Sequence, residues 1–61
     1  MDLRQIGKNI RKIRSEKEYT QERLAEIVEC SWRYLQAIEQ GNRIPSLKWL
    51  NNFSEKTGIP L

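Results

Sequence analysis

The chain has 61 residues and a formal net charge of +3, with one cysteine and no histidine. These counts exclude an intrachain disulfide and a Cys/His metal site, so the core must come from packed helices, with or without a partner subunit. Without histidine or a Gly-rich phosphate loop, the usual catalytic constellations cannot be assembled, and we expect no enzyme activity, no cofactor and no metal.

No apolar run is long enough to cross a bilayer, and the N-terminus lacks the apolar core of a signal peptide. We therefore expect no membrane partner and a reduced, cytoplasmic setting. Basic residues concentrate at the start of the chain, whereas the following segment is acidic. This asymmetry suits a protein with one side that faces a polyanion, although an ordinary solvated helix face explains the charges equally well.

A first helix is predicted from Asp2 to about Lys17. Asp2 can cap it, and Gln5 completes a weak capping-box pattern. The apolar positions recur at spacings of three and four residues, at Leu3, Ile6, Ile10 and Ile13. Glu18 then occupies the position where a helix usually ends on glycine.

The stretch from Thr20 to Gly41 organises the chain. Apolar residues at helical spacing follow Thr20 in one segment and Ser31 in the next, and both hydroxyl residues are favoured N-caps. Only Glu29 and Cys30 are free to turn, and Cys30 is predicted to fill the gap as a small apolar residue. So short a connection must cross the second helix over the first at a steep angle, which is the helix-turn-helix unit.

The second helix of this unit, at about residues 32–40, is predicted to enter DNA. Leu35 and Ile38 mark its buried face, and its other positions carry Trp32, Arg33, Tyr34 and Gln36. Arg33 and Tyr34 are expected off the buried stripe, and Trp32 partly tucked at its edge. An exposed guanidinium at Arg33 can bond a guanine edge bidentately. The same residue types also form protein-interface hot spots, so a helical protein-interaction module that uses this Trp/Arg/Tyr face is the alternative.

After Gly41 the sequence predicts a loop and a fourth helix. Pro45 rules out helix at Ile44, and Ser46 caps a helix that ends at Gly58. Its inward residues are predicted to be Leu47, Leu50 and Phe53, with Trp49 partly buried or in a dimer contact. Residues 59–61 look like the start of a fifth element. The predicted architecture is a single all-α domain over residues 1–61, a compact bundle of four to five short helices.

From Ile6 to Ile59 the chain resembles the DNA-binding domain of the Cro/phage-repressor helix-turn-helix family, also called the XRE family. The residues that carry the resemblance are Ile6-Gly7-x-x-Ile10-Arg11-x-x-Arg14, Thr20-Gln21-Glu22-x-Leu24-Ala25, Ser31, Leu35-x-x-Ile38-Glu39-x-Gly41, and Pro45-Ser46-Leu47 with Leu50. Glu18 and Glu29 depart from the pattern, because the family most often has glycine there. We therefore expect a left-handed backbone at both glutamates.

The resemblance implies a five-helix fold and a transcriptional regulator, bacterial or phage-encoded and associated with the nucleoid. It implies a repressor of phage, mobile-element, restriction-controller or antitoxin type that binds palindromic operator sites in double-stranded DNA as a homodimer. By position, the implied base contacts are Trp32, Arg33, Tyr34 and Gln36. The implied phosphate contacts are Gln21, Asn42 and Arg43. An ion pair between Arg14 and Glu39 is also implied, tying the first helix to the end of the third.

Overall fold

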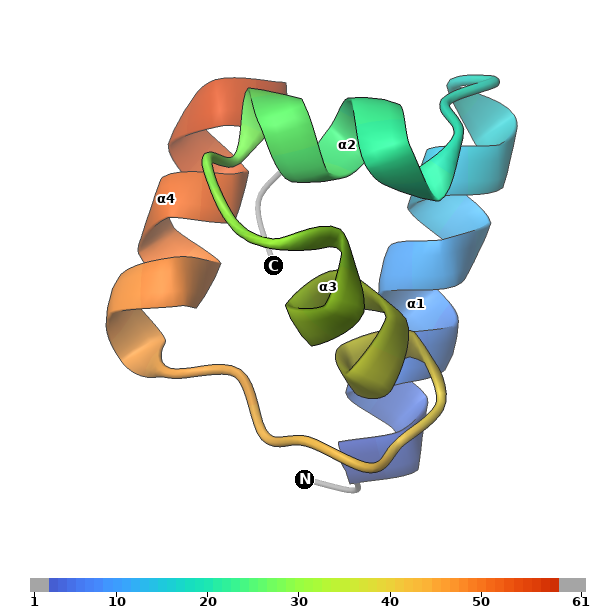
Figure 1. Cartoon of the computed structure of the whole chain (residues 1–61), viewed down its shortest axis with the longest axis vertical. Helices are drawn as coiled ribbons and strands as arrows, with labels where there is room; N and C mark the ends of the chain where they lie inside the picture. The colour runs from blue at the N-terminus through green and yellow to red at the C-terminus, as the bar shows by residue number, and fades with distance from the viewer. Residues whose placement is uncertain (1–2, 59–61) are drawn as a thin grey trace.

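The helices form in the predicted order. The computed structural model describes residues 3–58, and within that range it contains α1 (Leu3–Glu16), α2 (Gln21–Ile27), α3 (Trp32–Glu39) and α4 (Leu47–Thr57). In Figure 1, α2 runs across the top between α1 and α4, and α3 lies in front of the space that they enclose. The all-α prediction is confirmed. The cap predicted at Asp2 and the element predicted at residues 59–61 lie outside the described residues.

Hydroxyl side chains start the last three helices. The Thr20 Oγ1 accepts a hydrogen bond from the backbone N–H of Arg23 at 3.0 Å. The Ser31 and Ser46 hydroxyls likewise accept from the backbone N–H groups of Tyr34 and Trp49, each three residues later, at 3.1 and 3.0 Å. Each cap satisfies a backbone donor that has no partner within its own helix, and its loss typically costs about 1 kcal/mol. All three predicted caps are confirmed.

The first three helices end in the same way, with a left-handed residue that folds the chain back. Glu18, Glu29 and Gly41 hold φ angles of 59°, 57° and 79°. After each of them, the next backbone N–H bonds to the carbonyl five residues earlier, at 2.9–3.0 Å: Tyr19 to Arg14, Cys30 to Ala25 and Asn42 to Ala37. This is the Schellman motif, which usually takes glycine at the left-handed position. The left-handed backbone predicted at both glutamates is confirmed.

The core lies where α2, α3 and α4 meet α1. Its buried side chains are Ile10, Leu24, Ala25, Val28, Leu35, Ile38, Trp49 and Phe53. Trp49 stacks on Phe53 with ring centroids 5.4 Å apart and is only 7% exposed, so it is more deeply buried than predicted. Cys30 is half-buried and packs against this core as expected.

The prediction that Leu47 points inward is wrong, because this side chain is 75% exposed. Each step of three residues falls about 60° short of a full helical turn. Leu47 and Phe53, six residues apart, therefore lie on faces of α4 roughly 120° apart. The buried face of α4 instead follows Trp49 and Phe53, four residues apart, with Leu50 half-buried beside them.

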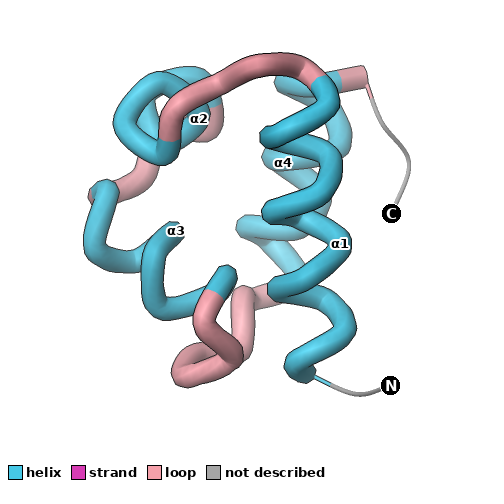
Figure 2. Tube along the Cα trace, turned by 90° about the vertical axis from the view of Figure 1, so that its right-hand side faces the viewer, coloured by secondary structure: helices cyan, strands magenta, loops and turns pink. Residues whose placement is uncertain are grey.

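Gly7 sets how closely α1 approaches the end of α3. A Cβ built on Gly7 would overlap the carbonyl oxygen of Ile38 and would lie 3.0 Å from that of Glu39. Both obstacles are backbone atoms, which cannot rotate away as a side chain can. The glycine therefore allows the two helices to cross in contact, and this places α3 on the edge of the molecule seen in Figure 2, beside α1 and below α2.

No helix in the described part is both long and apolar enough to span a membrane.

Candidate nucleic-acid interface

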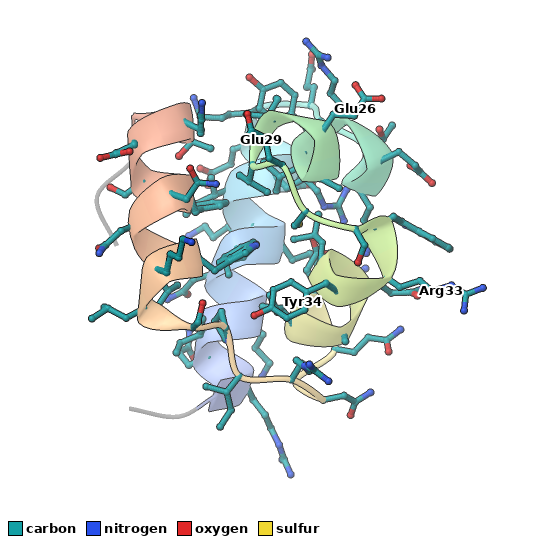
Figure 3. The ribbon with its side chains drawn as sticks, turned by 60° about the vertical axis from the view of Figure 1, so that its left-hand side comes forward. Glu26, Glu29, Arg33 and Tyr34 are labelled. Carbon is teal, nitrogen blue, oxygen red and sulfur yellow. The ribbon has the colours of Figure 1, made fainter. Side chains whose placement is uncertain are left out.

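The outer face of α3 carries the first group of predicted site residues. Arg33 is exposed in the first turn and makes no hydrogen bond or ion pair with any residue that the structure describes. In Figure 3 its side chain extends away from the helices into solvent. Gln36, one turn later on the same face, is half-buried. This face thus presents a guanidinium and an amide, which are the two groups best suited to bonding the edges of guanine and adenine.

Tyr34 does not share that face, and the prediction that it lies off the buried stripe is wrong. Its ring packs against the core and meets Trp49 edge-on at a centroid distance of 6.1 Å. Its hydroxyl accepts a hydrogen bond from the backbone N–H of Ser46 at 3.4 Å. Figure 3 shows Tyr34 and Arg33 pointing in opposite directions from α3. The reason is helical spacing, because Tyr34 lies four residues before Ile38 and so shares the buried side.

Tyr34 also supports the loop that follows α3. The guanidinium carbon of Arg43 lies 5.6 Å from the centre of the Tyr34 ring, within the range of a cation–π contact. Asn42 donates from Nδ2 to Oε1 of Gln40 at 3.3 Å. Asn42 and Arg43 are both exposed. The loop is therefore fixed by its neighbours while its two polar side chains remain accessible from solvent.

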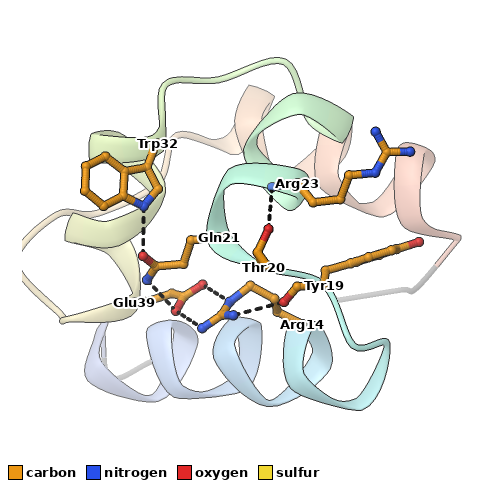
Figure 4. Close-up of polar contacts among 7 residues, drawn as sticks. All are labelled: Arg14, Tyr19, Thr20, Gln21, Arg23, Trp32 and Glu39. Atoms are coloured by element: carbon orange, nitrogen blue, oxygen red, sulfur yellow. Dashed lines mark hydrogen bonds and ion pairs between the residues drawn. The ribbon is translucent and has the colours of Figure 1, made fainter.

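Gln21, the first residue of α2, is held at both ends of its amide (Figure 4). Its Nε2 donates to Glu39 at 3.1 Å, and its Oε1 accepts from the indole N–H of Trp32 at 2.9 Å. A carboxylate can only accept and an indole can only donate, so these two partners fix which end of the amide is nitrogen. One Nε2 hydrogen is used by Glu39. The second hydrogen has no acceptor among the residues that the structure describes.

Beneath this amide lies the ion pair that ties α1 to α3. Arg14 donates to Glu39 through Nε at 2.8 Å and through Nη2 at 3.0 Å, a bidentate arrangement. Its Nη1 also donates to the carbonyl oxygen of Tyr19 at 3.0 Å. The side chain of Glu39 is 3% exposed and that of Arg14 17%. The predicted ion pair is present. Arg14 belongs to the basic N-terminal segment, but its guanidinium is engaged by Glu39 and is not available to a polyanion.

Sequence reasoning missed the bond between Trp32 and Gln21, which joins the first residues of α2 and α3. Nothing in helical periodicity reports a contact between two side chains eleven positions apart. The available signal was the tight turn, which sends α3 back across α2, a helix of only seven residues. Among residues 3–58, no cluster of His, Cys, Asp or Glu is arranged to hold a metal ion.

Two short helices joined by a tight left-handed turn, with the second laid on the surface and its polar face open, define a helix-turn-helix domain. The sequence model of the helix-turn-helix domain family matches residues 7–61, and the chain belongs to that family. The match agrees with the XRE-type motifs, and it gives the coarse function of a DNA-binding domain in transcription regulation, a class that is typically not enzymatic. No curated protein and no solved structure matched the chain.

Proposed function

We propose that this domain is a sequence-specific transcriptional repressor of phage, mobile-element, restriction-controller or antitoxin type that reads operator DNA in the major groove with α3. The observation that carries the proposal is the exposed Arg33 in the first turn of the second helix. In helix-turn-helix proteins the N-terminal residues of this helix contact base edges. A guanidinium there matches the two acceptors of guanine.

Base contacts are assigned to Trp32, Arg33 and Gln36, which lie on the open side of α3. Tyr34 was predicted to join them, but its ring lies between Arg43 and Trp49. We assign it instead to holding the loop that approaches the DNA backbone.

Phosphate contacts are assigned to Gln21, Asn42 and Arg43. The remaining Nε2 hydrogen of Gln21 supplies a donor at the start of α2, held in place by Glu39 and Trp32. Asn42 and Arg43 supply an amide and a positive charge from the exposed loop after α3. Such contacts fix the register of a protein on the duplex without carrying sequence information.

A homodimer on a palindromic site completes the proposal, with the two α3 helices in successive major grooves roughly 34 Å apart. Its targets would be bacterial or phage DNA in the cytoplasm. The alternative, a protein-interaction module, relied on a shared Trp/Arg/Tyr face. With Tyr34 turned toward α4, that aromatic face is smaller than the sequence indicated. DNA binding is therefore the better supported of the two.

The test compares Arg33→Ala with Arg43→Ala. Both residues are arginines with exposed side chains, one in the first turn of α3 and the other in the loop after it. Arg33→Ala should cost roughly 1–3 kcal/mol on the operator and relax the preference at one base pair per half-site. Arg43→Ala should weaken binding to all sequences alike and lower the log-salt slope by about one unit per monomer.

An operator is first selected from a random double-stranded library, and affinity for it and for random DNA is then measured by fluorescence anisotropy at several salt concentrations. Equal losses on both DNAs for Arg33→Ala would make Arg33 a phosphate contact and leave base recognition to Trp32 and Gln36. Wild-type binding that is insensitive to salt, or no enrichment of any sequence, would overturn DNA recognition and favour the protein-interaction alternative.

A further inference from the structure

Trp32 is an unusual residue to find at the start of a helix that reads bases, because its one polar atom is already used. The indole N–H donates to Gln21 Oε1 at 2.9 Å and faces α2 (Figure 4). Yet the side chain is 40% exposed, one of the few large apolar groups on the described surface that are so open. The exposed part of the ring therefore offers carbon atoms and no hydrogen-bonding group.

We propose that Trp32 is a specificity-determining residue that recognises the 5-methyl group of a pyrimidine in the major groove. This inference rests on the proposed DNA-binding function and adds a ligand group to it. The 5-methyl of thymine is the apolar feature that a base pair of unmodified DNA presents in that groove, and apolar side chains contact it. Trp32 is the first residue of α3, where side chains of this motif reach base edges.

The hydrogen bond to Gln21 gives the ring a fixed position for this contact. With its N–H tied to α2, the indole cannot rotate freely about its side-chain bonds. The same bond orients the Gln21 amide for a phosphate. Trp32 thus has two separable roles: the ring is proposed to contact the methyl group, and the N–H holds Gln21. Two substitutions can separate them, because phenylalanine keeps an aromatic ring without a donor and glutamine keeps an N–H donor without a ring.

The experiment replaces each thymine of the selected operator, one at a time, with deoxyuridine, which removes the methyl group and leaves base pairing intact. Burial of one methyl group corresponds to roughly a fourfold change in affinity. We expect a loss of about that size for the wild-type protein at one thymine per half-site and little change at the others. An operator with 5-methylcytosine at that position should bind roughly fourfold more tightly than one with cytosine. This comparison tests whether the methyl group is recognised on a second pyrimidine.

The variants then assign the effect to Trp32. Trp32→Phe should keep the deoxyuridine penalty while weakening binding to operator and random DNA alike. Trp32→Gln should abolish the penalty and should lose more affinity for the operator than for random DNA. Circular dichroism confirms that each variant is folded.

A penalty of the same size in Trp32→Gln, no gain from 5-methylcytosine, or no sensitive thymine at all would overturn the role of Trp32. Each of these results requires that wild type still binds its operator. They are therefore distinct from failure of the proposed function, in which wild type selects no sequence.

Discussion

Glu39→Gln is expected to destabilise the domain strongly, although the two side chains have nearly the same shape. The carboxylate of Glu39 accepts hydrogen bonds from Arg14 Nε at 2.8 Å, from Arg14 Nη2 at 3.0 Å and from Gln21 Nε2 at 3.1 Å. Glutamine offers one oxygen in place of two and points an NH₂ group at a donor. It also removes the negative charge, so the guanidinium of Arg14 is left without its counter-ion.

The expected loss is large relative to the stability of so short a chain. Removing one partner of a buried ion pair typically costs about 3–5 kcal/mol. We expect about 3 kcal/mol, the lower end of that range, because the Arg14 side chain is 17% exposed and can recover some hydration. At roughly 0.05–0.15 kcal/mol per residue, a 61-residue chain has a free energy of unfolding of only about 3–9 kcal/mol. A loss of about 3 kcal/mol corresponds to a fall in Tm of roughly 12–24 °C.

Thermal and urea unfolding, followed by far-UV circular dichroism, measure this loss. The matched control is Glu26→Gln, because Glu26 pairs with Arg23 at 3.2 Å while both side chains are more than 60% exposed, at 71% and 62%. Exposed pairs of this kind contribute about 0–1 kcal/mol, so the control should melt close to wild type. If Glu39→Gln melted at the same temperature as Glu26→Gln, the pair would contribute no more than a surface contact and the reasoning would fail.

Two further substitutions test the backbone geometry by the same unfolding measurements. Gly7→Ala should cost about 2 kcal/mol despite the higher helix propensity of alanine, because its Cβ would overlap the Ile38 carbonyl. Ser15→Ala on the exposed side of α1 is its control and should cost nothing. Glu29→Gly should be neutral or stabilise by less than about 1 kcal/mol, since relief of strain is offset by a freer unfolded chain. Glu16→Gly should instead cost about 1 kcal/mol, and a similar loss at Glu29 would contradict its left-handed conformation.

The features that the sequence predicts well are set by local interactions. Caps at Thr20, Ser31 and Ser46 depend on a side chain and a backbone N–H three residues later, so residue type and position suffice to place them. The turns at Glu18 and Glu29 were harder, because glutamate has no preference for positive φ. They were found through the family pattern, which has glycine at those positions, and the φ angles bear this out.

The errors concern which way side chains face, and each has a geometric cause. A stripe read from spacings of three drifts around the helix, and this drift misplaced Leu47 on the buried side. Tyr34 was placed on the open side because only Leu35 and Ile38 were used to define the buried one. Adding the four-residue spacing from Tyr34 to Ile38 would have corrected it. The base and phosphate contacts themselves depend on the position of DNA, which periodicity within one chain does not report.

Glu39 connects the stability of the fold to the arrangement of the residues that we propose to contact DNA. Its carboxylate holds Arg14 of α1 from one side and the amide of Gln21 from the other. Gln21 in turn accepts the indole N–H of Trp32, so the orientation of the exposed ring depends on a buried charge that lies too deep to touch DNA. The four residues form one hydrogen-bonded chain across α1, α2 and α3. A substitution at any of them therefore acts on the others, and packing and recognition in this domain are not independent of each other.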